Sequence, residues 1–166
     1  MNKKGFTLIE ITVTLAILGI ISAIAIPSYF SWLPKYRLQT SVRHIYDDLN
    51  MARSGAVRTN IVAVAIFNIP NDNYTIFLDT SGNGILDGSE TVISNGRLED
   101  GVDIYGSTFS SNTLGFNNRG MPATALTGQD DSVFLRNPSG LYMGVRVNTA
   151  GGLTIINSTD GGTTWS

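Results

Sequence analysis

Hydrophobic and polar residues divide this chain into stretches of different periodicity. The first is an almost unbroken apolar run from Phe6 to Ile26, which contains one charged residue, Glu10. As a helix this run is about 31 Å long, close to the thickness of a bilayer's hydrocarbon core. The run therefore predicts a membrane-spanning helix over residues 6–27, with a bend at Pro27 because proline removes a helical hydrogen bond.

Residues 28–60 predict an amphipathic continuation of the same helix. Apolar residues recur there at alternating steps of four and three, which places them on one helical face. They are Leu38, Val42, Ile45, Leu49, Ala52 and Ala56. Most charged residues fall off this face, and Pro34 marks a second expected bend. The first half of the helix should thus lie in a membrane or filament core, and the second half should pack on a globular head.

From residue 61 the chain consists of short strand-like runs separated by Gly, Asn, Asp and Ser. Runs at 61–69 and 74–78 flank a turn sequence at 70–73 and predict a β-hairpin. Further strands are expected at 91–94, 102–105, 114–117, 132–136, 141–148 and 153–157. A helix followed by strands predicts an α+β fold in which an antiparallel β-sheet packs on the amphipathic helix. Residues 28–60 and 61–166 should form one globular unit, with a polar, mobile tail at 158–166 apart from Trp165.

The N-terminal residues admit three interpretations. Ala23 and Ala25 form the small-x-small pattern of a secretory cleavage site. A plain membrane anchor would explain the apolar run but would leave Glu10 unexplained. The third interpretation rests on residues 3–10, KKGFTLIE, which resemble the class III signal of the type IV pilin superfamily. That superfamily includes type IV pilins and the pseudopilins of type II secretion systems.

The resemblance implies a maturation route and an assembly contact. A prepilin peptidase and methyltransferase would remove residues 1–5 by cutting between Gly5 and Phe6, and would methylate the new amine of Phe6. Glu10 would pair with the Phe6 amine of a neighbouring subunit, and Pro27 would be the family's helix-bending proline. Opposite charges attract strongly in a low-dielectric helix bundle, although desolvation offsets much of the gain. The pair would therefore chiefly set the register between helices.

Shorter segments resemble the pseudopilin H and FimT-like minor pilins in particular. Residues 49–57 resemble the L-x-x-A-R-S-x-A segment of that group, residues 114–120 its F-x-x-x-G turn, and residues 145–155 its closing strand pair. Some FimT-like members bind DNA through a basic Gly-Arg-x-Arg turn near the C-terminus. The matching turn here, residues 150–154, reads AGGLT and contains no arginine.

Composition excludes several other classes of function. The chain has no cysteine, so disulfides, thiolate metal sites and cysteine nucleophiles are absent, as is the C-terminal disulfide loop common in major pilins. His44 is the only histidine and lies beside the apolar face, so we expect a solvated surface residue rather than a zinc ligand or catalytic base. The net charge of −2 becomes −4 on side chains after loss of Lys3 and Lys4, which argues against nucleic-acid binding.

One loop carries possible ligand chemistry. Residues 79–90 match the twelve-residue calcium-loop template with one substitution, Ser81 at the third position. The predicted ligands are Asp79, Ser81, Asn83, the backbone carbonyl of Ile85, Asp87 and Glu90. The alternative is a plain β-turn, because Asp, Asn, Gly and Ser are ordinary turn residues. The sequence therefore predicts a protein that requires no cofactor, with calcium as an optional ligand.

These observations favour a non-enzymatic structural subunit. We expect a minor pilin or minor pseudopilin, inserted in the bacterial inner membrane and assembled into a periplasmic pseudopilus or a cell-surface pilus. The resemblance implies other pilins or pseudopilins, the prepilin peptidase and the inner-membrane assembly platform as partners. A major pilin and a DNA-binding competence pilin are the alternatives.

Overall fold

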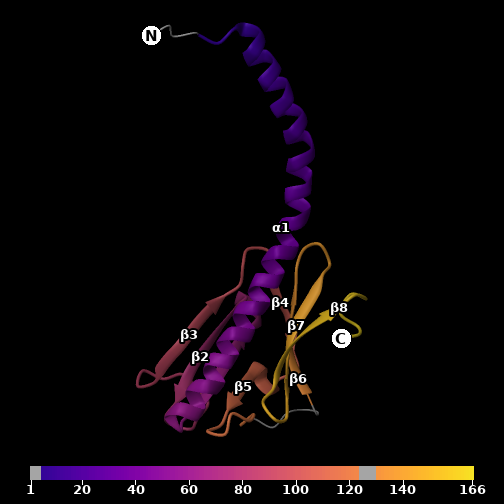
Figure 1. Cartoon of the computed structure of the whole chain (residues 1–166). Helices are drawn as coiled ribbons and strands as arrows, with labels where there is room; N and C mark the ends of the chain where they lie inside the picture. Colours follow the sequence, from indigo (N-terminus) through magenta and orange to yellow (C-terminus); the bar gives the residue numbers. More distant parts are fainter. Residues whose placement is uncertain (1–4, 124–129) are drawn as a thin grey trace. The chain divides into compact units, whose positions relative to one another are not determined.

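The computed structural model describes residues 5–123 and 130–166. It begins with one helix, α1 (Leu8–Thr59), whose helical assignment is unbroken at both Pro27 and Pro34. The chain forms two compact units, Met1–Leu33 and Pro34–Ser166. The first unit is the N-terminal part of α1 together with the residues before it, and the second unit is the head. The expected α+β architecture, one long N-terminal helix and antiparallel sheets, is confirmed (Figure 1).

Every side chain from Gly5 to Trp32 is exposed in the first unit. Large apolar residues make up much of this surface, with exposed fractions from 45% at Ile11 to 85% at Phe6. This part of α1 is long and apolar enough to cross a membrane. Because burial of apolar surface drives folding and association, such a segment is stable only in lipid or against other apolar surfaces.

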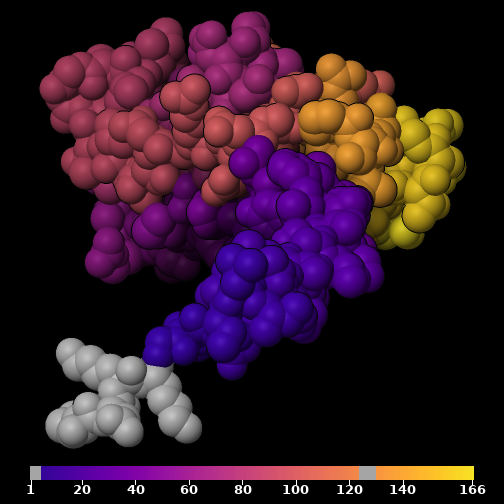
Figure 2. Space-filling model, turned by 90° about the horizontal axis from the view of Figure 1, so that it is seen from above, coloured from indigo at the N-terminus to yellow at the C-terminus, as the bar shows by residue number. Residues whose placement is uncertain are grey.

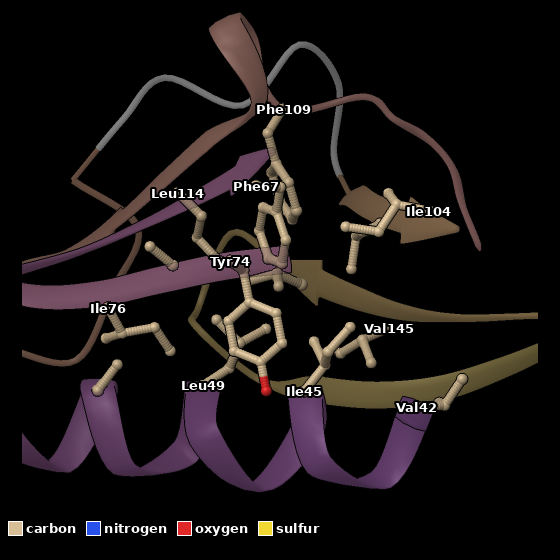
Figure 3. Close-up of a cluster of buried hydrophobic side chains, with 14 of the residues drawn as sticks. Val42, Ile45, Leu49, Phe67, Tyr74, Ile76, Ile104, Phe109, Leu114 and Val145 are labelled. Carbon is tan, nitrogen blue, oxygen red and sulfur yellow. The ribbon is translucent and has the colours of Figure 1, made fainter. Parts of the chain in front are cut away.

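The second unit is built on the amphipathic half of α1, and the predicted apolar face is confirmed. All six of its residues are fully buried: Leu38, Val42, Ile45, Leu49, Ala52 and Ala56. Figure 3 shows Val42, Ile45 and Leu49 projecting from α1 toward side chains of the strands, including Ile76 and Val145. His44 is exposed, as expected for a residue beside this face.

Within the described residues the head contains two four-stranded antiparallel sheets, where the sequence predicted one antiparallel sheet. The first sheet has the order β3-β2-β1-β5 and the second the order β4-β6-β7-β8. The strands of the first are β1 (Val62–Asn68), β2 (Asn73–Asp79), β3 (Thr91–Arg97) and β5 (Thr113–Phe116). Those of the second are β4 (Asp103–Ser107), β6 (Asp130–Arg136), β7 (Tyr142–Asn148) and β8 (Leu153–Ser158). Short 3-10 helices, η1 (Ile69–Asn71) and η2 (Ser110–Asn112), complete the fold.

A shared core joins the two sheets. The rings of Phe67 in β1 and Phe109 after β4 stack with centroids 5.8 Å apart. The Asp72 carboxylate, in the β1–β2 connection, accepts a hydrogen bond of 2.8 Å from the backbone amide of Ile104 in β4. The predicted hairpin of β1 and β2 is confirmed, and it therefore also anchors the second sheet.

Three turns of the head repeat one sequence pattern, Asn-x-x-Gly. They begin at Asn117, Asn137 and Asn148, and the glycines at their fourth positions have φ of 71°, 75° and 78°. In each turn the asparagine side-chain oxygen accepts backbone amides two and four residues further on. A left-handed glycine after a turn is typical of three-residue hairpin loops. The repeat fixes the β6–β7 and β7–β8 hairpins.

The C-terminal residues fold back on the second sheet, where the sequence predicted a mobile tail. The Trp165 ring packs on Phe134 of β6 with centroids 4.4 Å apart. The Asp160 carboxylate accepts the backbone amides of Thr163 and Thr164, which closes the intervening turn. Hydrogen bonds from the Thr164 hydroxyl, and then from its backbone amide and the Ser158 hydroxyl, hold the pKa of Asp160 well below its usual range. The tail is thus tied down by an aromatic contact and by local hydrogen bonds.

Candidate functional site

The first candidate site is the start of α1, where Thr7 and Glu10 form a reciprocal cap. The Glu10 carboxylate accepts hydrogen bonds from the Thr7 backbone amide at 2.8 Å and from the Thr7 hydroxyl at 2.9 Å. The Thr7 hydroxyl oxygen in turn accepts the Glu10 amide at 3.3 Å. This is a capping box, in which a Thr at the N-cap and a Glu three residues later satisfy amides that have no helical partner.

The capping box places Gly5 and Phe6 outside the helix. Both residues are exposed and have no regular secondary structure. A Cβ added to Gly5 would meet no atom within 4 Å, and its φ is not in the left-handed region, so the fold itself does not require glycine there. The predicted cleavage site is therefore accessible and lies directly before the first helical turn. Within a single chain, Glu10 already has a partner, Thr7, that the sequence analysis did not identify.

The second candidate site is the loop between β2 and β3, which folds around the buried carboxylate of Asp79. One Asp79 oxygen accepts the backbone amides of Gly82 and Asn83, and the other accepts the amide of Gly84 at 2.8 Å. Burial raises the pKa of Asp79, but hydrogen bonds from these amides and from the Ser81 hydroxyl outweigh that effect. The pKa of Asp79 therefore lies below its ordinary value, and the loop is organised by an ionised carboxylate.

The structure gathers some of the predicted calcium ligands and not others. The Ser81 hydroxyl bridges Asp79 and Glu90, at 3.2 Å and 3.1 Å. Asn83 instead accepts the amide of Ile85, and Asp87 accepts the amide and hydroxyl of Ser89. Among the described residues, no group of three His, Cys, Asp or Glu side chains is placed to hold a metal. Oxygen donors are the ligands that calcium prefers, but in this structure Asn83 and Asp87 accept hydrogen bonds within the loop.

A half-buried polar cluster ties α1 to the first sheet. The Asp48 carboxylate accepts hydrogen bonds from the Tyr74 hydroxyl at 2.8 Å and the Ser94 hydroxyl at 2.7 Å. Burial, followed by the hydrogen bond and the charge of Asp48, raises the pKa of Tyr74 far above its usual range. Figure 3 shows the Tyr74 hydroxyl directed at α1. A tyrosine that stays protonated and donates to a carboxylate is a structural link rather than a catalytic base.

Two arginines make contacts within the head that fix their side chains. Arg136 makes an ion pair of 3.3 Å with Asp103 and lies over the ring of Tyr105. Arg53 of α1 donates to the carbonyl of Gly120 at 2.9 Å and so holds the turn that contains Arg119. The β7–β8 turn packs its Gly151 against that same carbonyl, so closely that a side chain would not fit.

Comparison with known proteins places the chain among pilin-like proteins. Residues 41–151 match the family model for the type II transport protein GspH, and residues 1–26 match a prokaryotic N-terminal methylation motif. The chain is 32% identical over 89 residues to the type IV major fimbrial protein FimA of Dichelobacter nodosus, a match that covers 54% of this chain and half the length of FimA. It is 28% identical over 133 residues to the pilin-like protein PilA1 of Thermus thermophilus, covering 76% of this chain and 84% of PilA1.

A solved structure shares the fold. The minor pseudopilin EpsH from the type 2 secretion system of Vibrio cholerae aligns with a TM-score of 0.54 and 12% sequence identity. The alignment covers 75% of this chain and 99% of the EpsH chain. At this identity the likeness establishes the arrangement of helix and sheets, while the family model over residues 41–151 establishes the relationship in sequence.

Proposed function

We propose that this chain, which belongs to the GspH family of type II transport proteins, is a minor structural subunit of a type II secretion pseudopilus or a type IV pilus. One observation carries the proposal. An N-terminal methylation motif over residues 1–26 coincides with an apolar helical segment in which every described side chain is exposed. Such a surface requires lipid before assembly and neighbouring helices after it. The chain's role is then to build a filament rather than to catalyse a reaction.

The proposed route begins in the inner membrane. The apolar part of α1 anchors the chain while the head folds on the periplasmic side. The prepilin peptidase cuts between Gly5 and Phe6, and the assembly platform moves the mature chain into a periplasmic pseudopilus or a surface pilus beside other pilins or pseudopilins. The open space around Gly5 supports this route, because a glycine that the fold does not need is explained by the peptidase.

Mass spectrometry of the mature chain tests the processing step. The N-terminal residue should be Phe6 with a methylated amine, and Gly5→Leu should leave the precursor in the membrane. Gly19→Leu is a matched control, because Gly19 also has open space around it but lies within the helix. A mature chain that retains Met1, or that begins near Ala25, would refute the proposal.

Two substitutions at Glu10 separate its capping role from its proposed charge pairing. Glu10→Gln keeps a carbonyl that can accept the Thr7 amide and so retains the capping box, but it removes the charge. Glu10→Ala removes both. If the carboxylate pairs with the Phe6 amine of a neighbour, both variants should insert in the membrane and fail to enter filaments. Normal assembly of Glu10→Gln would show that capping alone is needed.

A major-subunit role is the second candidate function. It is favoured by the 32% identity to FimA, which is a major fimbrial protein. The copy number in purified filaments distinguishes the two roles. If the chain is a minor subunit, it should make up only a small fraction of all subunits in the filament. If it is a major subunit, it should account for most of the filament mass.

A further inference from the structure

The outer edge of β8 presents backbone groups that no other strand of its sheet uses. β8 is the last strand in the order β4-β6-β7-β8. At its C-terminal end, Asn157 and Ser166 exchange backbone hydrogen bonds of 2.9 Å and 3.0 Å on the side away from β7. Because outward and inward groups alternate along an antiparallel strand, the amides and carbonyls of Leu153 and Ile155 also face outward. Among the described residues no backbone group pairs with these outward positions, which continue the ladder that Ser166 begins at Asn157.

The other three sheet edges of the described strands are blunted. β3 and β4 each carry an irregularity that shifts their register against the neighbouring strand. β5 is covered on its outer side, where Phe116 bridges to Pro122 and the amide of Ala123 donates to the Gly115 carbonyl at 2.7 Å. β8 pairs with β7 in unbroken register over its length. Bulges and covering segments are the usual means of preventing strand addition, and β8 has them only at Asn157.

A groove between β8 and α1 adjoins this edge. It consists of three hollows of about 370, 490 and 270 Å³. The hollows are neighbours, because Arg43 and Ile155 line the first two and Gln39 and Met143 line the last two. Leu153 and Ile155 are half-buried and pack on the core from the α1 side of the sheet. In Figure 2 the C-terminal residues, in yellow, lie at the surface of the head beside the orange segment that includes β7. Side chains of an added strand that face α1 would lie in this groove.

We propose that the β8 edge and the adjoining groove bind an extended segment of the neighbouring filament subunit by strand addition. The inference rests on the proposed function. The segment's backbone pairs with Leu153 and Ile155 in line with Ser166, over roughly four residues. Its side chains on the α1 side are apolar, to match Met143 and Ile155, and polar groups flank them opposite Arg43 and Asp47, which line the first hollow.

Amide hydrogen exchange of the full chain tests the proposal, first in detergent and then in purified filaments. The outward amides of Leu153 and Ile155 should exchange freely in detergent and slow by about tenfold or more in filaments. The inward amides of Thr154 and Ile156, bonded to β7, should be protected in both states. This alternation between neighbouring residues distinguishes strand addition from general burial of the β8 side of the head. General burial would slow exchange of exposed amides whether or not they belong to alternate residues of β8.

A pair of variants tests the edge independently. Ile155→Pro removes an outward amide while leaving the bonds between β7 and β8 available, and Ile155→Val keeps the amide. The proline variant should enter filaments several-fold less than the valine variant, while Thr154 and Ile156 stay protected. Filaments in which the Leu153 and Ile155 amides still exchange freely would overturn the proposal and leave the proposed function standing. A chain absent from all filaments would overturn both.

Discussion

A substitution at Gly96 tests whether the half-buried cluster of Tyr74, Asp48 and Ser94 holds α1 on the first sheet. Gly96 in β3 pairs directly with Tyr74 in β2, and the tyrosine ring lies over the glycine. A Cβ at position 96 would fall inside van der Waals contact with three atoms of that ring. The ring has little room to move, because it is 3% exposed and its hydroxyl is bonded to Asp48 at 2.8 Å. Gly96→Ala must therefore either compress the core or break that hydrogen bond.

Both routes lead to a similar loss of stability. Overpacking a core costs about 1–3 kcal/mol, and giving up a hydrogen bond to a charged group costs about 1.5–3 kcal/mol. We expect Gly96→Ala to lower the free energy of unfolding of the head by about 2 kcal/mol. For a unit of this size that corresponds to a fall in melting temperature of roughly 6–10 °C. Thermal unfolding of the full chain in detergent, followed by circular dichroism, measures the change.

A double-mutant cycle identifies the cause of the loss. In a Tyr74→Leu background the ring is gone, so Gly96→Ala should be neutral or slightly stabilising, because alanine restricts the unfolded chain. Gly106→Ala in β4 is the matched control, since a Cβ there meets nothing within 4 Å. An equal loss from Gly96→Ala in both backgrounds, or no loss in the wild type, would refute the explanation.

Three further predictions concern the loop and the arginines. The pKa of Asp79 is lower in the folded state than in the unfolded state. The ionised carboxylate therefore stabilises the folded head fully above the unfolded-state pKa of about 4, and this stabilisation is lost as pH falls through the folded-state pKa. The stability difference between wild type and Asp79→Asn should therefore be constant near neutral pH and shrink in acid denaturation below about pH 4. We propose calcium as an optional ligand of the same loop. Millimolar calcium should then raise the melting temperature of the full chain, and Glu90→Gln should abolish that rise. Calorimetry without a binding signal would favour the plain turn. The full chain should show no measurable duplex DNA binding at physiological salt, and micromolar binding removed by Arg119→Ala would contradict this expectation.

Periodicity predicted the elements well because burial in this head follows simple geometry. The spacing of Leu38, Val42 and Ile45 determines which face of α1 is apolar, and all three are fully buried. Turn residues marked the strand boundaries, and each predicted strand is present to within a few residues. The division into two sheets was not predictable, because β5 pairs with β1 although three strands, β2, β3 and β4, lie between them in the sequence. Sequence spacing contains no information on such distant pairing.

Two local motifs in the sequence correspond to hydrogen-bonded features of the structure. Thr7 and Glu10 have the three-residue spacing of a capping box, which predicts a helix that begins directly after Thr7. The Asn-x-x-Gly pattern at Asn117, Asn137 and Asn148 recurs with the same hydrogen bonds each time, and it predicts three turns of one type. The fold-back of the tail has a weaker signal, since Trp165 alone does not indicate that it packs on Phe134.

The candidate site residues differ in whether their polar groups find hydrogen-bond partners, and their apolar groups find burial, within one chain. Asp79, Asn83 and Asp87 each accept hydrogen bonds from backbone amides or a hydroxyl inside the loop. The Glu10 carboxylate also accepts hydrogen bonds within its own chain, from Thr7. Its negative charge has a specific role in assembly only if the Phe6 amine of a neighbouring subunit pairs with it. Among the described residues, by contrast, the apolar surface of the N-terminal part of α1 is exposed, and the outward amides of Leu153 and Ile155 in β8 have no backbone partner. Because unmet apolar area and unmet backbone groups are what association removes, these two features indicate where neighbouring subunits bind.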